Sequence, residues 1–142
     1  MSRMIFVNLP VADLDRAKAF YEALGFANNP QFSDETAACM VWSESIFVMI
    51  LTHPKWATFT DRPIPDGGSS EVALCLTFDT RQEVETIAEA GGRAGGLLDA
   101  NPPQDHGFMM SRTVADPDGH VWEFVWMDQN FAGDGAAAQT AA

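Results

Sequence analysis

The sequence contains few basic residues. Only 8 of its 142 residues are Lys or Arg, against 20 Asp or Glu, and its formal net charge is -12. A surface with this charge repels phosphate backbones and anionic lipid headgroups, so we expect neither nucleic acid nor a membrane as a partner. The sequence also contains no apolar run close to the roughly 20 residues that a membrane-spanning helix needs.

Cysteine is scarce as well. The two cysteines, Cys39 and Cys75, lie in apolar runs, and the sequence has neither a CxxC pair nor a Cys/His cluster. This pattern excludes a disulfide framework and a zinc site of the usual spacing. The N-terminal sequence MSRMIFVNLPV lacks the long apolar stretch and cleavage site of a signal peptide. We therefore expect a cytoplasmic protein with reduced thiols.

The hydrophobic pattern that is present predicts two similar halves. Hydrophobic residues make up 46% of the chain and aromatic residues 11%, which is enough for a packed core. The order of β-like and helical segments reads βαβββ, linker, βαβββ. We predict one domain over residues 1–130, with modules at about 4–52 and 71–127, a linker at 53–70 and a flexible tail at 131–142.

The two expected helices cover about residues 13–24 and 80–90. Each begins at an aspartate that can cap its first turn, Asp13 in the first half and Asp79 in the second. Each ends at glycine, which favours a helix C-terminus. The similar offsets in both halves indicate an internal repeat, although a generic α+β fold without a repeat is the alternative.

Two segments of the sequence resemble one superfamily. VADLDRAKAFYEALGF resembles the first-helix signature of the vicinal oxygen chelate superfamily, and DPDGHVWEF resembles its closing-strand signature. That superfamily includes glyoxalase I, extradiol dioxygenases and bleomycin-resistance proteins. The resemblance covers residues 4–127. It implies an α+β fold in which paired βαβββ modules form a curled eight-stranded cleft with the helices outside. It also implies a homodimer, often with the cleft shared between subunits.

The resemblance further implies where a metal would bind. In metal-dependent members each module supplies two ligands from its first and last strands. The matching positions here are Phe6, Ile50, Ala73 and Glu123. Only Glu123 has a side chain that coordinates a divalent cation, and one carboxylate does not hold such an ion alone. We therefore expect no cofactor and no divalent metal at these positions.

Glu123 is the residue whose place in the sequence most needs an explanation. It lies in the apolar strand HVWEFVW, where alternation puts Glu123 on the cleft face and Trp122 and Phe124 on the helix face. A carboxylate in an apolar cleft is a candidate acid or base, and Glu71 is a candidate partner for catalysis. Ligand binding without chemistry and a structural role, with Arg112 as an ion-pair partner, remain alternatives.

The expected cleft is mostly apolar, as small-molecule sites usually are. We expect seven residues to line it and contact a ligand: Phe6, Asn8, Ile50, Ala73, Cys75, Met110 and Arg112. His120 follows Gly119 in a turn and is interpreted as a surface residue. The sequence favours a protein that binds a small, largely apolar molecule without the usual metal. The alternative is an enzyme of lyase, isomerase or dioxygenase type that uses Glu123 with an atypical or absent metal site.

Overall fold

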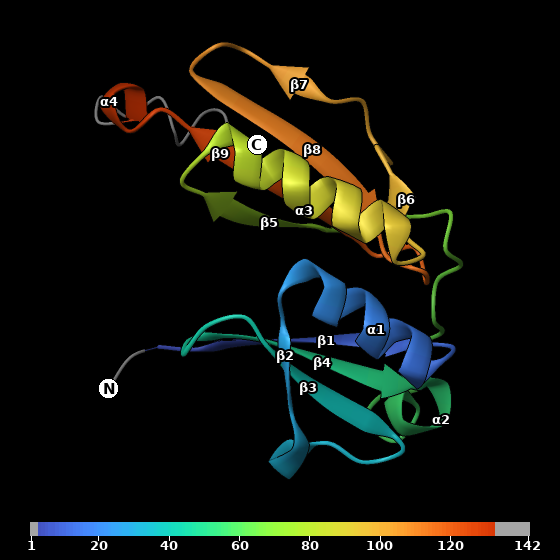
Figure 1. Cartoon of the computed structure of the whole chain (residues 1–142). Coiled ribbons are helices and arrows are strands. Elements are labelled where there is room, and N and C mark those ends of the chain that lie inside the picture. Colours follow the sequence, from blue (N-terminus) through green and yellow to red (C-terminus); the bar gives the residue numbers. More distant parts are fainter. Residues whose placement is uncertain (1–2, 133–142) are drawn as a thin grey trace.

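The computed structural model describes residues 3–132 and contains two mixed sheets, one from each half of the chain (Figure 1). In the first sheet the strand order is β1-β4-β3-β2, with β1 parallel to β4 and the other neighbours antiparallel. The elements of this half are β1 (Ile5–Val11), α1 (Leu14–Leu24), β2 (Ala27–Asn29), a 3-10 helix (Pro30–Phe32), β3 (Ala37–Val41) and β4 (Ile46–Thr52).

The second half repeats this plan. Its strand order is β5-β9-β8-β6, again with a parallel pair, β5 and β9, and with antiparallel neighbours beyond it. A short additional strand, β7, pairs with β8. The elements are β5 (Ala73–Phe78), α3 (Arg81–Arg93), β6 (Leu97–Leu98), β7 (Gln104–Asp105), β8 (Met109–Ala115) and β9 (Val121–Met127). The predicted pair of βαβββ modules is therefore confirmed.

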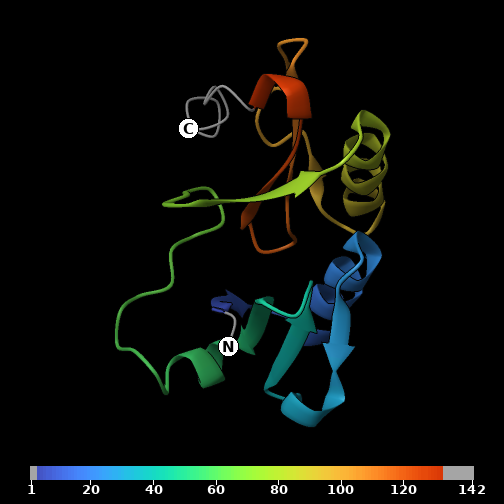
Figure 2. The same cartoon turned by 90° about the vertical axis from the view of Figure 1, so that its left-hand side faces the viewer.

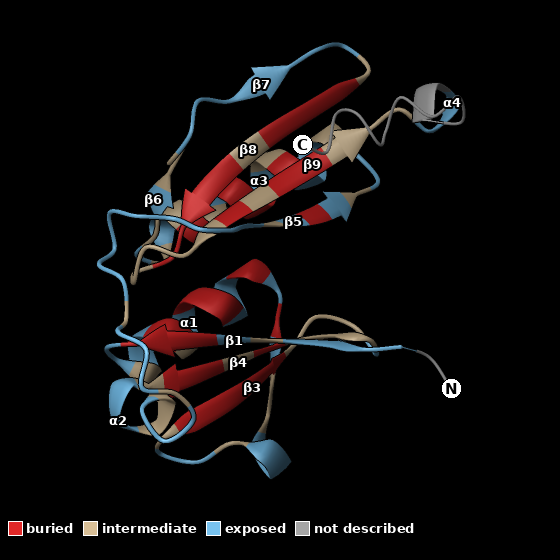
Figure 3. Ribbon diagram, turned by 180° about the vertical axis from the view of Figure 1, so that it is seen from behind, coloured by how far each residue is buried: buried red, intermediate tan, exposed pale blue. Residues whose placement is uncertain are grey.

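Both long helices lie on the same side of the molecule and contact each other there (Figures 1 and 2). The core lies between these helices and the sheets, and it includes Phe20 and Tyr21 of α1 and Trp122 and Phe124 of β9. Burial colours in Figure 3 show the same arrangement, with buried segments along the strands and along α1. The helices thus cover one face of the sheets and leave the other for a cleft, as the resemblance implies.

The first helix has the predicted ends. The Asp13 side chain accepts a hydrogen bond from the Arg16 backbone N–H over 3.1 Å, which satisfies a free donor of the first turn. Gly25 ends the helix with φ 109°, a conformation that glycine adopts without steric cost.

The second helix differs from the prediction at both ends. Thr80, not Asp79, caps it, because the Thr80 hydroxyl accepts the Glu83 backbone N–H. The helix also continues through its glycines to residue 93. A Cβ at Gly91 would lie 3.1 Å from side-chain atoms of Leu24 and Val114, so this glycine permits the close approach of α1 and α3.

The predicted linker is not uniformly irregular. It begins with the short helix α2 (His53–Trp56) and then crosses the open side of the molecule from one sheet to the other (Figure 2). After β9 the chain forms α4 (Gln129–Ala132), and most of the tail predicted at 131–142 lies outside the described residues. Among residues 3–132 there is no helix with the length and apolarity to cross a membrane.

Buried hydrogen bonds fix the second module to the first. The Tyr21 hydroxyl of α1 donates to Asp116 Oδ2 over 2.6 Å, and the Trp122 indole N–H donates to the Tyr21 oxygen over 3.0 Å. Nearby, the Ala12 backbone N–H donates to Asp118 Oδ1 over 2.8 Å. The turn between β8 and β9 is therefore held against the end of β1 and the start of α1.

Candidate functional site

Strand alternation places Glu123 on the face of the second sheet away from the helices. Trp122 and Phe124 on either side of it are buried in the core, so the Glu123 side chain points to the opposite face of the sheet. On β1 the same argument applies, since Leu9 and Val11 are core residues. The side chains that alternate with these β1 residues, including Phe6 and Asn8, therefore point to the cleft side.

Cys75 is the neighbour of Glu123 on this face. The two residues are opposite each other in the parallel pair of β5 and β9. Desolvation raises the pKa of the Cys75 thiol to about 12, and the charge of Glu123 and a hydrogen bond to it add to the rise. The thiol is therefore a proton donor to the Glu123 carboxylate rather than a nucleophile. Ala73 lies two residues earlier on the same face of β5, at the position predicted.

Two predicted cleft residues point the other way. Ile50 is 0% exposed and Met110 is 6% exposed, and both belong to the core between the sheets and the helices. The prediction that they line the cleft is wrong. The pairing of β1 with β4 explains the error for Ile50, because Phe47 is the residue opposite Phe6, and the intervening alternation turns Ile50 toward α1.

Arg112 also lies away from the cleft. Its guanidinium donates to both Asp99 oxygens over 2.8 and 2.9 Å and to Glu85 of α3 over 2.6 Å. These hydrogen bonds and charges raise the pKa of Arg112. The predicted ion pair with Glu123 is therefore wrong, since Arg112 is occupied on the helix side of the sheet, where Met110 and Val114 also point.

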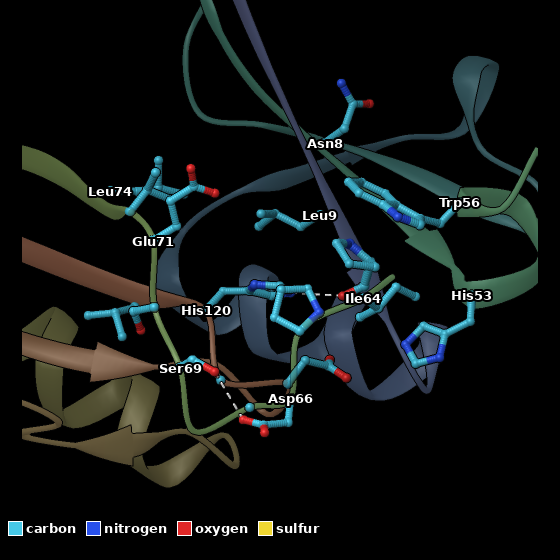
Figure 4. A pocket seen from close by; sticks show the side chains of 18 residues that line it. Asn8, Leu9, His53, Trp56, Ile64, Asp66, Ser69, Glu71, Leu74 and His120 are labelled. Carbon is cyan, nitrogen blue, oxygen red and sulfur yellow. Dashed lines mark hydrogen bonds between the residues drawn. The ribbon is translucent and has the colours of Figure 1, made fainter. Parts of the chain in front are cut away.

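A cavity of about 470 Å³ lies between the two modules at the linker end of the cleft (Figure 4). Asn8 and Pro10 of β1 form one wall, and the linker with Glu71 and the start of β5 forms another. His120 closes it from the turn before β9, and its Nε2 donates to the Pro10 carbonyl over 2.8 Å. His120 was interpreted as a surface residue, but it bridges two walls of a cavity. Its position depends on a contact with residue 10 that the local sequence does not reveal.

A second cavity of about 620 Å³ adjoins the first. The two cavities share the lining residues Asn8, Trp56, Pro65 and Glu71. Trp56 is not among the predicted site residues, because residues 53–70 have the composition of a linker. An aromatic residue in a segment between two modules is the signal that could have indicated it. Asn8 and Glu71 are thus the predicted site residues that line the two cavities.

Glu71 and Glu123 do not form a close pair. Glu71 precedes β5 by two residues and lines both cavities, whereas Glu123 lies opposite Cys75 farther along the sheet. Glu71 lies in a bend before β5, four residues before Cys75. Among the described residues no hydrogen bond joins the Glu71 and Glu123 carboxyl groups, and their role as an acid and base pair stays a prediction.

Comparison with known proteins gives a consistent result. A family model described as the bleomycin resistance protein-like N-terminal domain matches residues 3–43. A hypothetical protein from S. aureus has 25% identity and a TM-score of 0.74, over 89% of this chain and 95% of that one. A glyoxalase-related enzyme from Fulvimarina pelagi has 22% identity and a TM-score of 0.74, over 89% and 88% of the two chains.

A fosfomycin resistance protein from Listeria monocytogenes is similar too, with 17% identity and a TM-score of 0.63 over 89% of this chain and 91% of that one. A search of the curated proteins found no match. The chain has the fold of these glyoxalase and bleomycin-resistance structures, and the family match of its first module supports the resemblance to the vicinal oxygen chelate superfamily. The resemblance seen in the sequence is confirmed at this level.

The residues of this cleft do not fit a divalent metal. Phe6 and Phe47 are stacked with their ring centroids 4.5 Å apart, so the cleft face of the first sheet presents aromatic rings instead of donors at these two positions. In the second sheet, Cys75 and Glu123 offer two donor side chains. Within residues 3–132, no three His, Cys, Asp or Glu side chains are grouped as a metal site would require. No chemical step is therefore derived through a metal.

Proposed function

We propose that this protein binds a small, largely apolar molecule in the cleft without the divalent metal of related enzymes. The observation that carries the proposal is the cavity of about 620 Å³ over β1 and β4, a size typical of small-molecule sites. Its apolar lining comes from Leu51, Trp56, Phe59, Pro63 and Pro65. Four polar residues complete the lining and can orient a ligand: Asn8, Thr60, Arg62 and Glu71.

The first experiment measures binding of a neutral probe, phenylbutanol, by calorimetry and by the shift in melting temperature. Binding to the folded state raises the melting temperature in proportion to affinity and concentration. Replacing Trp56 by Ala removes the indole from both cavities and should weaken binding about tenfold, the loss expected for part of a buried aromatic contact.

Leu97→Ala is the matched control, since Leu97 is an exposed apolar residue outside both cavities. It should leave the affinity for phenylbutanol unchanged. If phenylbutanol and a panel of other neutral aromatic compounds neither bind nor stabilise the protein, the proposed function is wrong.

We also propose that the protein is a cytoplasmic homodimer. Its two cysteines are free, which fits a reducing compartment. β1 and β5 are edge strands, and Met4, Ile5 and Phe6 at the start of β1 are about half exposed. Apolar residues on an open edge favour association with another chain. Light scattering at micromolar concentration tests this proposal, and a monomer would contradict it.

An enzyme of lyase, isomerase or dioxygenase type is the alternative function. The hydrogen-bonded pair of Glu123 and Cys75 on the cleft face favours it, because this arrangement places a proton donor beside a carboxylate. Activity that Glu123→Gln abolishes, with unchanged affinity for phenylbutanol, would support this alternative. A Glu123→Gln variant as active as the wild-type protein would refute this alternative.

A further inference from the structure

The connection between the two modules is weakly secured. Residues 57–71, called the strap below, contain neither helix nor strand, and none of them is buried. Within residues 3–132, each hydrogen bond of the strap goes to the strap itself or to α2, and none reaches either sheet. Connections of roughly 12–15 residues without regular structure are uncommon in compact domains, and many act as lids or binding loops. Such a segment opens at little cost, because few contacts must be broken.

The strap nevertheless forms much of the wall of both cavities (Figures 2 and 4). In the cavity of about 620 Å³ only Asn8 and Leu51 come from the sheets, and the other lining residues are Trp56 of α2 and residues of the strap. In the cavity of about 470 Å³ the strap contributes residues between Ile64 and Glu71. A ligand in either cavity therefore lies between the strap and the sheets, and the larger cavity exists only while the strap is in place.

Gly67 brings the strap into close contact with the turn between β8 and β9. A Cβ placed on Gly119 would lie 2.7 Å from the Gly67 Cα atom, and a Cβ placed on Gly67 would lie 3.2 Å from the Asp118 carbonyl oxygen. The two backbones approach this closely because both residues are glycine. The turn itself is fixed, since the Gly119 N–H donates to the Asp116 carbonyl and the Asp118 side chain accepts the Ala12 N–H. The strap therefore rests on a fixed surface at Gly67.

We propose that the strap is a lid over the two cavities and that the contact of Gly67 with the turn before β9 is its latch. The structure shows the closed state. In the open state Gly67 leaves the turn, and the ligand enters between the strap and the sheets. The sequence GGSS at residues 67–70 gives the backbone freedom for this movement. This inference rests on the proposed function, because it assigns how the same ligand enters. A ligand that binds only beneath the closed strap shifts the equilibrium toward the closed state.

Cleavage of the full chain after Glu71 by a glutamyl endopeptidase, without ligand, measures the opening of the strap. A protease acts on a displaced segment, so its rate follows the open fraction when closure is faster than cleavage. Gly67→Leu should raise the cleavage rate about fivefold, because its side chain would press on the Asp118 carbonyl and disfavour the closed state. Mass spectrometry identifies the cleaved bond and follows its rate.

Gly68→Leu is the matched control. The nearest atom to a Cβ at Gly68 belongs to the Asp66 side chain, and Gly68 lines neither cavity. This variant has the same loss of glycine freedom and should change the cleavage rate by less than about twofold. Peptides of residues 62–76 with each substitution correct for the preference of the protease itself. If Gly67→Leu does not keep the circular dichroism spectrum of the wild-type protein, Gly67→Ala replaces it and should raise the rate about twofold, with Gly68→Ala as its control.

Phenylbutanol tests whether the closed strap covers the ligand. At about ten times its dissociation constant it should slow cleavage of the wild-type protein after Glu71 roughly tenfold, because binding to the closed state depletes the open state in proportion to saturation. Cleavage after Glu35 is the internal control, since Glu35 is exposed in a loop outside both cavities. Its rate should not change with phenylbutanol.

The outcomes separate the lid from the proposed function. Faster cleavage after Glu71 in Gly67→Leu than in Gly68→Leu, together with protection by phenylbutanol, would support the lid and its latch. Equal cleavage rates for the two variants would overturn the latch. Binding of phenylbutanol without slower cleavage after Glu71 would overturn the lid and leave the proposed function intact. If phenylbutanol and the panel of neutral aromatic compounds do not bind, the proposed function and the lid are both wrong.

Discussion

The contact between Tyr21 and Asp116 allows a quantitative test of how the two modules are held together. Tyr21 is the single tyrosine of the chain and is fully buried. Tyr21→Phe keeps the ring but removes the hydroxyl that donates to Asp116 and accepts from the Trp122 indole. Asp116 also accepts the backbone N–H groups of Asp118 and His120, so three donors surround its carboxylate.

The magnitude follows from the two hydrogen bonds that are lost. A bond to a charged carboxylate contributes about 2 kcal/mol, and the bond from Trp122 contributes about 1 kcal/mol. The free energy of unfolding should therefore fall by about 3 kcal/mol at neutral pH. For a domain of this size, that loss corresponds to a decrease in melting temperature of about 10 °C.

The cost of Tyr21→Phe should also depend on pH. Burial raises the pKa of Asp116, and the hydrogen bond from Tyr21 opposes that rise. A carboxyl group whose pKa is higher in the folded state stabilises the fold when protonated, and this contribution is lost as pH rises through the folded pKa. The variant lacks the opposing hydrogen bond, so its pKa is higher still. The difference in unfolding free energy between Tyr21→Phe and the wild-type protein should therefore become smaller as the pH falls from neutral to about 5.

Urea denaturation near neutral pH and near pH 5 measures both effects. Thr58→Val is the control, since it removes a hydroxyl that donates to the Lys55 carbonyl at an exposed site. It should cost less than about 0.5 kcal/mol. A loss for Tyr21→Phe as small as that of the control, or a loss that grows on acidification, would refute the reasoning.

Three further predictions concern other parts of the fold. Gly96→Ala should lower the unfolding free energy by about 2 kcal/mol or more in urea titrations, because its Cβ would lie 2.6 Å from the Phe20 ring, and Gly68→Ala should have little effect. Arg112→Lys loses the two hydrogen bonds to Asp99 and should lower the unfolding free energy by about 1 kcal/mol in the same titrations. The affinity for phenylbutanol should be unchanged, and weaker binding would contradict the placement of Arg112 outside the site. At mildly alkaline pH, Cys75 in the folded protein should react with iodoacetamide roughly a hundredfold more slowly than in the urea-unfolded chain, as measured by mass spectrometry. Glu123→Gln should accelerate this reaction. Fast alkylation of the wild-type thiol would contradict the raised pKa.

Local sequence was sufficient for the ends of the first helix and for the orientation of the β9 side chains. The cap at Asp13 and the stop at Gly25 use residues within one turn of the helix, so they can be read directly. The direction of Glu123 could also be predicted, because bulky aromatic residues flank it and fix which face enters the core. These signals are short in range and do not depend on which strand is the neighbour.

The direction of residues in β4 and β8 could not be read in the same way. Ile50 and Met110 lie in strands that are apolar or buried on both faces. Alternation of polar and apolar residues therefore does not show which side chains face the core. Pairing with other strands decides it, and that pairing joins residues far apart in the sequence. The role of Arg112 depends in the same way on Asp99 and Glu85, which only the folded chain brings to its side.

The cavities depend on contacts of still longer range. Residues 53–70 contain the turn and loop composition of a connector, and that composition says nothing of where the segment lies. Trp56 and Glu71 come together with Asn8 only because the chain crosses the open side of the sheets between the two modules. A site built from a connector is therefore the part that sequence periodicity reveals least.

The two segments that carry the resemblance meet in one buried contact. Tyr21 belongs to the first-helix signature, and Asp116 and Trp122 belong to the closing-strand signature, so these motifs join the modules. Their residues lie in the core, on the opposite side of the sheets from the cleft residues Phe6 and Cys75. A sequence can therefore retain both signatures while its cleft changes from metal donors to aromatic rings. The buried residues of the two signatures predict the fold well and the chemistry poorly, because they hold the modules together on the side of the sheets away from the cleft.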